Sequence, residues 1–161
     1  MNKRVKFITQ SAAIAAIYIV LTVFISAFGL ANGAIQIRLS EALTILPYFS
    51  LSALPGLFIG CLISNLITGC AIWDVVFGSI ATLIGAVFTY LLKNKSKYLA
   101  PIAPILSNSI IIPFVLIYVY GIKDAWWFLF LTVGIGEVIS CGVLGIMLLN
   151  IIEKNKNLIF K

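Results

Sequence analysis

The chain has 161 residues, of which 62% are hydrophobic and 10% are charged, whereas soluble domains carry about 25% charged residues. We therefore expect one membrane-embedded domain over residues 1–161 and no soluble second domain. The chain contains no histidine, which excludes a histidine-based metal site or catalytic triad. The net charge of +6 does not indicate nucleic-acid binding, because the basic residues flank apolar segments, as they do beside anionic lipid.

The apolar residues fall into five stretches separated by polar or glycine-containing turns. Four of the stretches suit one membrane-spanning helix each, which needs roughly 20 residues. The stretch 39–67 is interrupted by Pro47 and Pro55, so it could cross the membrane once with a kink or twice as two short helices. In chain order, the stretches are 8–28, 39–67, 72–92, 101–121 and 125–152.

The positions of the basic residues favour two crossings for residues 39–67. Cytoplasmic loops are enriched in lysine and arginine. With six crossings, nine of the eleven basic residues lie on one side, and only Arg38 and Lys123 lie on the other. We therefore predict an all-α membrane protein with six transmembrane helices and both termini in the cytoplasm. The clusters on the cytoplasmic side are Lys3/Arg4/Lys6, Lys93/Lys95/Lys97 and Lys154/Lys156/Lys161.

Glu137 is the first candidate for a functional residue. It lies about 12 residues into the last apolar stretch, which places it near the middle of the membrane at 1.5 Å per residue. An ionisable group at that depth is costly unless it is paired or solvated, so it marks a functional site by default. Gly134 and Gly136 precede it and leave room for a ligand. The alternative is a carboxylate paired with a neighbour for packing alone.

Two other acidic residues lie toward the outer face. Arg38 and Glu41 are three residues apart and can share one helix face. They could form a salt bridge at the membrane edge, or Glu41 could face the bundle interior while Arg38 orders the outer loop. Asp74 lies at the outer end of the stretch 72–92.

Four uncharged side chains are further candidates for ligand contacts. Asn65 and Asn108 offer both donors and acceptors, although polar groups in apolar helices also join helices to each other. Trp73 and Trp127 could stack on a flat ligand, although tryptophan at this depth is also typical of the aromatic belt of membrane proteins.

Other features concern partners and cofactors. Ala12 and Ala16 have the four-residue spacing of small residues that suits contact with another membrane protein. The sequence has no phosphate-binding loop of the form G-x-x-x-x-G-K-[ST], so ATP used in transport would be hydrolysed by a partner, and we expect no metal or cofactor in this chain. We interpret the three cysteines, which form no C-x-x-C pair, as small packing residues: Cys61, Cys70 and Cys141.

Four stretches of the sequence resemble the queuosine-precursor transporter family (QueT), whose members are substrate-binding S components of energy-coupling factor (ECF) transporters. The stretch AIQIRLSEALTILP at 34–47 resembles the family signature after the first helix. The other three are PGLFIGCLISN at 55–65, WDVVFGSIATL at 73–83 and VGIGEVISCGVLG at 133–145. The resemblance covers essentially the whole chain, in order.

The resemblance implies a six-helix membrane protein that captures its ligand from outside and then associates with a transmembrane coupling subunit and two ATPase subunits. In that superfamily, alanines spaced by four on the first helix contact the coupling subunit, and Ala12 and Ala16 match them. The implied ligand is a queuosine precursor or a queuine-like 7-deazaguanine. An S component for another small vitamin or nucleobase is the alternative. A channel-like or structural membrane subunit is favoured less, and an enzyme is not expected.

A 7-deazaguanine presents two adjacent N–H donors, which one carboxylate can accept as a bidentate pair. On this hypothesis Glu137 binds that edge and Glu41 or Asp74 meets an amine on the seven-position, although the roles could be exchanged. An asparagine amide would address the carbonyl oxygen, and an indole would stack on the ring. The candidate substrate-binding residues are Glu137, Glu41, Asp74, Asn108, Trp73, Asn65, Arg38 and Trp127.

Overall fold

The structure is a computed structural model that describes residues 2–29 and 37–155. Lys156 and Lys161 of the third basic cluster lie outside the described residues. Within the described ranges the regular structure is entirely helical. In chain order, the elements are α1 (Lys3–Ala27), η1 (Leu39–Tyr48), α2 (Ala53–Ile67), α3 (Ile72–Leu92), η2 (Lys97–Leu99), α4 (Ile102–Tyr118), α5 (Trp126–Glu137), η3 (Val138–Leu144) and α6 (Gly145–Lys154).

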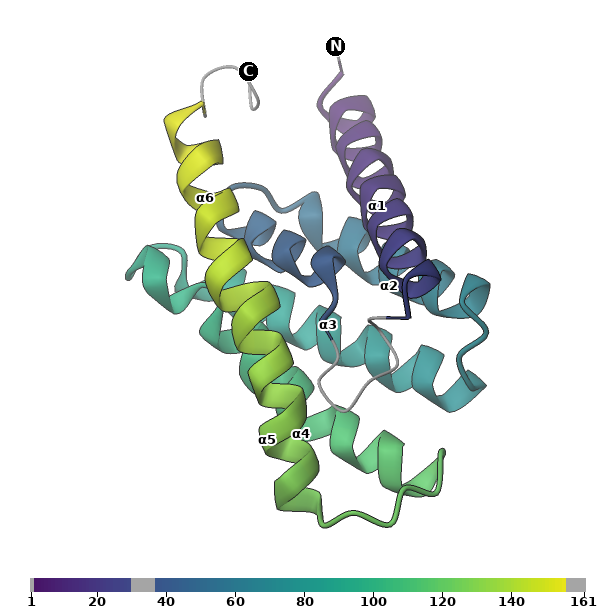
Figure 1. Ribbon diagram of the computed structural model, residues 1–161. Coiled ribbons are helices and arrows are strands. Elements are labelled where there is room, and N and C mark those ends of the chain that lie inside the picture. The colour runs from purple at the N-terminus through teal and green to yellow at the C-terminus, as the bar shows by residue number, and fades with distance from the viewer. Residues whose placement is uncertain (1, 30–36, 156–161) are drawn as a thin grey trace.

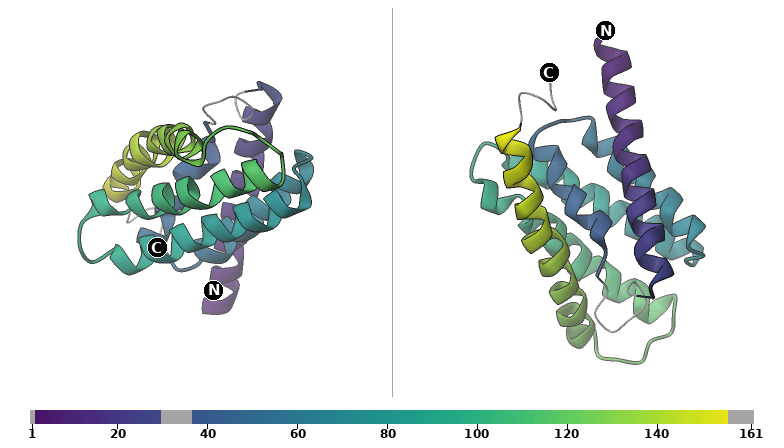
Figure 2. Two further views of the ribbon diagram at one scale, coloured as in Figure 1. Left: turned by 90° about the horizontal axis from the view of Figure 1, so that it is seen from below. Right: turned by 45° about the horizontal axis from the view of Figure 1, so that its top comes forward.

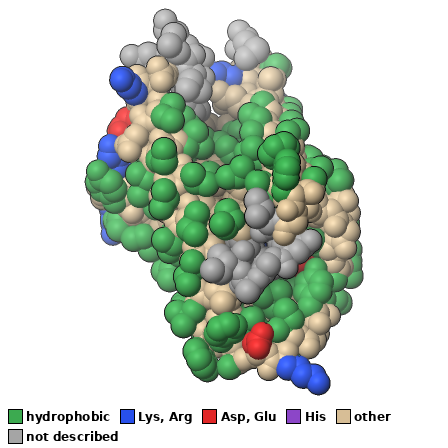
Figure 3. Space-filling model, viewed as in Figure 1, with side chains coloured by type: hydrophobic (Ala, Val, Ile, Leu, Met, Phe, Trp, Pro, Cys, Tyr) green, Lys and Arg blue, Asp and Glu red, His purple; other side chains and the backbone are tan. Residues whose placement is uncertain are grey.

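Four helical segments have the length and hydropathy of a membrane span: α1, α3, η2 with α4, and the continuous rod formed by α5, η3 and α6. The rod crosses the full height of the molecule in Figure 1. On the face shown in Figure 3, hydrophobic side chains cover most of the described surface, and charged side chains gather toward its upper and lower ends. The predicted all-helical membrane class is therefore confirmed.

Residues 39–67 form two helices, as one of the two sequence interpretations expects. The 3₁₀ helix η1 has 10 residues and measures about 20 Å at ~2.0 Å per residue. The α-helix α2 has 15 residues and measures about 22 Å. Each is shorter than a hydrocarbon core of about 30 Å, so six full crossings stay a prediction.

The helix η1 lies at the centre of the bundle and contacts α1, α2, α3, α6 and η3. In Figure 2, right, it runs between α1 and α6. A 3₁₀ helix repeats every three residues, so Glu41 and Thr44 share one face, while Leu43 and Leu46 share another. Residues 40–47 are all buried. The central helix therefore presents a polar face and an apolar face at once.

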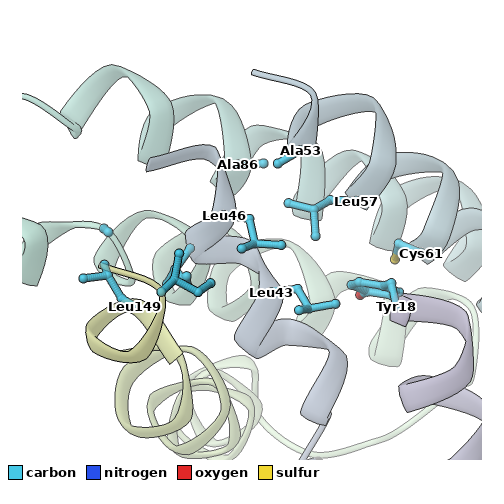
Figure 4. Packing of buried hydrophobic residues seen from close by; sticks show 11 residues of the cluster. Tyr18, Leu43, Leu46, Ala53, Leu57, Cys61, Ala86 and Leu149 are labelled. Carbon is cyan, nitrogen blue, oxygen red and sulfur yellow. The ribbon is translucent and has the colours of Figure 1, made fainter. Parts of the chain in front are cut away.

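The apolar face of η1 forms the core. Figure 4 shows Leu43 and Leu46 between Leu149 of α6 on one side and Tyr18 and Leu57 on the other. Each of these five side chains is at least nine-tenths buried. The core therefore fixes η1, and the polar face of η1 is directed away from it.

The helices α1 and α2 pack closely because α2 carries glycines at their contact. A Cβ atom on Gly60 would lie 2.8 Å from Cβ of Tyr18, and one on Gly56 would lie 2.7 Å from the carbonyl oxygen of Ser11. Small residues permit such backbone approach. The close contact holds Tyr18 against the centre of the bundle.

Side-chain contacts join elements at both ends of the molecule. Lys97 of η2 forms an ion pair with Glu153 of α6, with 2.9 Å between Nζ and Oε2. Tyr120, just after α4, donates to Oδ2 of Asp74 at the start of α3 over 2.8 Å. The beginning of α1 and the end of α6 lie at the same end of the molecule in Figure 1.

Candidate ligand-binding site

A small buried cavity lies between η1, α3, α4 and α5. The space that the centre of a water-sized sphere can occupy in it is about 10 Å³. The cavity therefore has room for about one water molecule. Glu41, Asn108 and Glu137 are 1%, 3% and 7% exposed. The cavity is lined by Arg38, Glu41, Gly78, Thr82, Asn108, Ile112, Val133 and Glu137.

Each oxygen of the two carboxylates faces one hydrogen-bond donor. Oε1 of Glu41 accepts from the hydroxyl of Tyr18, and its Oε2 lies 3.4 Å from Nδ2 of Asn108. The same Nδ2 lies 2.9 Å from Oε1 of Glu137. Oε2 of Glu137 accepts from Sγ of Cys141 over 3.1 Å. The Asn108 amide therefore bridges two carboxylates that are 96 residues apart in sequence.

The carbonyl oxygen of the bridging Asn108 amide has no hydrogen-bond partner among the described residues. Oδ1 of Asn108 is buried and makes no hydrogen bond to any described residue. A buried acceptor without a donor costs about 1–3 kcal/mol. The site therefore contains an acceptor that a ligand N–H group could satisfy.

Arg38 lines the cavity and is half-buried, but its guanidinium makes no ion pair with Glu41 or Glu137. Among the described residues, the ion pair is the one between Lys97 and Glu153. The sequence alternative of an Arg38–Glu41 salt bridge is therefore wrong, because Glu41 turns into the bundle. With both acids ionised, the three charged groups at the cavity carry a formal charge of −1.

The ligand atoms of Glu41, Glu137 and Cys141 lie within 4.8 Å of one another. Two carboxylates and a thiol could hold a Zn²⁺-like cation. The hydrogen bonds with Tyr18 and Asn108 account for this cluster without a metal, so we assign none.

Asn65 and Asp74 lie next to the cavity but do not line it. A Cβ atom on the lining residue Gly78 would be 3.2 Å from Nδ2 of Asn65 and 3.5 Å from Oδ1 of Asp74. The Asn65 amide contacts Sγ of Cys61 at 3.6 Å. Both polar side chains therefore lie beside Gly78, next to the cavity lining.

Asp74 has a partner at the beginning of α3. Tyr120 donates its hydroxyl hydrogen to Asp74, and the backbone N–H of Ala71 donates to the same hydroxyl over 3.2 Å. Partial burial, together with this bond to Asp74, raises the pKa of Tyr120 to about 12. The pair links the start of α3 to the end of α4.

The two candidate tryptophans lie outside the cavity. Trp73 and Trp127 are 58% and 63% exposed. Trp73 stacks on Phe77, with 6.1 Å between ring centroids. The cavity has no aromatic lining among the described residues, and its apolar walls are Ile112 and Val133. The placement of the indoles suits the membrane interface.

Sequence reasoning missed Tyr18 and gave Cys141 a packing role, which its complete burial supports, but not its contact with Glu137. The buried face of α1 has helical spacing, and Tyr18 lies in its middle as the largest polar side chain. Cys141 follows Glu137 by four residues on one rod, a spacing that places side chains together. Both signals were present, but tyrosine and cysteine in apolar helices are common packing residues.

Ala12 and Ala16 are exposed on α1 and line a groove between α1 and α2. The groove is apolar apart from Ser11. The α1 span is 28% buried, against 39–50% for the other three long spans. The helix α1 is therefore the least covered of the four long spans.

The apolar helices and the buried polar cavity define a multi-pass membrane protein with an internal site. Residues 8–154 match the QueT transporter family. The chain therefore belongs to this family, which confirms the resemblance found in the sequence. It is 32% identical over 90 residues to the protein named Queuosine precursor transporter QueT from Lactococcus lactis subsp. cremoris (strain MG1363).

That match covers 56% of this chain and 53% of the Lactococcus protein. The chain therefore spans about half the length of this relative. No solved structure matches the chain.

Proposed function

We propose that this protein is the substrate-binding S component of an ECF-type importer and captures a queuosine precursor, or queuine, from outside the cell. The observation that carries the proposal is the pair of buried carboxylates, Glu41 and Glu137, bridged by Asn108 inside an apolar bundle. Ionisable groups at such positions are costly and typical of substrate sites. Membership in the QueT transporter family and the name of the Lactococcus relative support the class of ligand.

The donors and acceptors of the site suit a 7-deazaguanine. In the proposal, Glu137 accepts the two adjacent N–H groups of the base. The unpartnered Oδ1 of Asn108 accepts a further N–H, or the amide turns so that Nδ2 donates to the carbonyl oxygen. The flat ring lies against Ile112 and Val133 rather than against an indole.

The charge of the site favours a precursor with one ammonium group. Glu41 and Glu137 together with Arg38 carry a formal charge of −1, which one cation would balance. A buried charge is tolerated only when it is paired. We place the ammonium group beside Glu41. Asp74 is the second candidate, because it lies next to the cavity but does not line it.

The cavity must widen before a bicyclic base can enter, because pockets for such ligands measure roughly 300–1,000 Å³. The backbone N–H of Arg38 donates to Oγ of Ser140 over 3.2 Å, and this bond joins the beginning of η1 to the rod. One hydrogen bond contributes about 1 kcal/mol. We therefore propose that the site opens by movement of Arg38 and Leu39, which precede the buried residues 40–47 of η1.

Six crossings with both termini in the cytoplasm are part of the proposal. The ion pair of Lys97 with Glu153 brings a lysine of the second basic cluster to the end of α6, where Lys154 of the third cluster follows Glu153. The start of α1, which carries the first cluster, lies at the same end as the end of α6 (Figure 1). Lys123 lies in the connection between α4 and α5. These positions agree with the enrichment of cytoplasmic loops in basic residues.

The proposed partners are a transmembrane coupling subunit and two ATPases, which supply the ATP hydrolysis. The face of α1 around Ala12 and Ala16 supports such a contact, because it is exposed, small and apolar. Small residues let two membrane helices approach closely. Ala16→Trp would fill this face and weaken assembly with the coupling subunit without touching the buried carboxylates.

Calorimetric titration of the detergent-solubilised protein tests the ligand class. The probes are 7-aminomethyl-7-deazaguanine, 7-cyano-7-deazaguanine and queuine, with riboflavin and thiamine as controls. Saturable binding of a deazaguanine and no binding of the vitamins supports the proposal. Binding of a vitamin alone would overturn the substrate and keep the S-component architecture. No binding of any probe would contradict the proposed function.

A further inference from the structure

We infer that Cys141 is a positioning residue that fixes the separation of the two carboxylates and thereby sets the preference for a ligand that engages both. The inference rests on the proposed function, because it concerns the same cavity. It goes beyond that function by assigning selectivity to a residue that does not itself line the cavity.

Cys141 touches parts of both acidic residues. Its side chain is 0% exposed. Sγ lies 3.1 Å from Oε2 of Glu137 and 3.4 Å from the carbonyl oxygen of Glu41. Thr44 already donates its hydroxyl hydrogen to that carbonyl over 2.6 Å. The thiol hydrogen is assigned to Glu137, because the carboxylate oxygen is the nearer acceptor and the stronger one. The sulfur then packs against the backbone that carries Glu41.

The π-helical segment η3 produces this placement. It begins directly after Glu137 and runs from Val138 to Leu144. A π-helical turn is wider than an α-helical turn and is frequent at functional sites. Here, two consecutive residues reach η1. Ser140 accepts from the backbone N–H of Arg38 over 3.2 Å, and Cys141 contacts Glu41.

The contacts between the rod and η1 continue beyond Cys141. Oγ1 of Thr44 lies 3.4 Å from Sγ of Cys141. A Cβ atom on Gly145 would lie 3.1 Å from Cγ2 of Ile45, so the two helices are in close contact there. These contacts between η3 and η1 therefore fix the position of η1 along the rod. Cys141 lies among them and contacts both acidic residues.

Asn108 also connects the two carboxylates, but its amide lines the cavity and would contact the ligand. Once the ligand takes over those amide contacts, Cys141 is the described side chain that still links Glu137 to the backbone of Glu41. A ligand with a donor at each end needs both acids at a fixed separation. A ligand with one donor end needs only one acid.

The experiment compares two ligands on matched variants. The two-ended ligand is 7-aminomethyl-7-deazaguanine, and the one-ended ligand is unsubstituted 7-deazaguanine. Calorimetry gives the ratio of their dissociation constants for the wild type, Cys141→Ala and Cys141→Ser. Cys61→Ala is the control, because Cys61 is also a buried thiol but touches neither carboxylate. Thermal unfolding is recorded for each protein.

We expect Cys141→Ala to lower the preference for the two-ended ligand by about fivefold or more, the effect of losing one hydrogen bond. Cys141→Ser should restore most of the preference because it restores a donor, and Cys61→Ala should leave the ratio unchanged. Should Cys141→Ala not fold, Cys141→Val, which keeps apolar volume without a donor, gives the same comparison.

A ratio that stays the same in Cys141→Ala, while the wild type binds both bases, would overturn the inference alone, whatever happens to stability. A wild type that binds neither base would overturn the proposed function and this inference with it.

Discussion

The hydroxyl of Tyr18 on α1 donates a hydrogen bond to Oε1 of Glu41, 23 residues further along the chain. Both side chains are 1% exposed. The bond connects the helix with the exposed Ala12–Ala16 face to the buried carboxylate of the cavity. It also leaves Oε2 of Glu41 directed toward Asn108.

Tyr18→Phe should lower the free energy of unfolding by about 1–3 kcal/mol, because a buried carboxylate oxygen loses its donor. Thermal unfolding in detergent measures the change. Tyr98→Phe is the control, since Tyr98 is 62% exposed. Equal unfolding temperatures for the two variants would show that the Tyr18 hydroxyl does not stabilise the fold.

Glu41→Gln should weaken the binding of 7-aminomethyl-7-deazaguanine more than Asp74→Asn does. Glu41 lines the cavity, whereas Asp74 does not line it and is bonded to Tyr120. The dissociation constants of the two variants, measured by calorimetry, should differ by about tenfold or more, because the ammonium group of the ligand is left as an unpaired buried charge in Glu41→Gln. A larger loss of affinity in Asp74→Asn would show that Asp74, rather than Glu41, binds the ammonium group.

Gly60→Ala should destabilise the protein by about 1–3 kcal/mol, the usual range for overpacking. The added Cβ would lie 2.8 Å from Cβ of Tyr18 and 3.2 Å from Cα of Ala15, so α1 would have to shift. Gly142→Ala is the matched control, because its Cβ would meet neighbours at 3.7 Å or more. Unfolding midpoints give the comparison, and a neutral Gly60→Ala would contradict the close packing.

Tyr120 should titrate at about pH 12, above the ordinary tyrosine value of about 10. Since its pKa is raised in the folded protein, its contribution to stability is complete below about pH 10 and is lost as the pH rises to about 12. Phenolate absorbance measures the titration in the wild type and in Tyr120→Phe. Asp74→Asn should lower the pKa of Tyr120, and Tyr118→Phe is the exposed control. An unchanged high-pH step in Tyr120→Phe would refute the assignment.

Single cysteines test the six crossings. In a Cys70→Ser background, Lys123→Cys should react with a membrane-impermeant maleimide on intact cells, and Lys95→Cys should react only after permeabilisation. Five crossings with a cytoplasmic N-terminus would give the reverse, because residues 39–67 would then cross once. The comparison therefore separates the two interpretations of that stretch directly.

The hydropathy of the sequence was sufficient to place the long helices. The stretch 72–92 coincides with α3, because lipid-facing helices are defined by composition and end where polar residues return. The 3₁₀ form of η1 could not be predicted, because it depends on burial by five other elements. The π-helical turn after Glu137 has no sequence signature of its own, so it could not be predicted.

The site could be predicted in part. Glu137, Glu41 and Asn108 stand out because each is polar within an apolar stretch, and the structure brings all three together. Their mutual contacts depend on tertiary packing that no local pattern encodes. Trp73 and Trp127 are candidates because an indole can stack on a flat ligand, but an indole also suits the membrane interface, and the structure leaves both exposed.

We propose that the carboxylate of Glu137 binds the ligand inside the membrane domain. This proposal is tested by the affinity of the wild type, Glu137→Gln and Glu153→Gln for the deazaguanine that the wild type binds. Glu153 is an exposed acid near the end of α6 and serves as the control. We expect the affinity to fall about a hundredfold or more in Glu137→Gln and to stay unchanged in Glu153→Gln. Full affinity in a folded Glu137→Gln protein would show that this carboxylate does not bind the ligand.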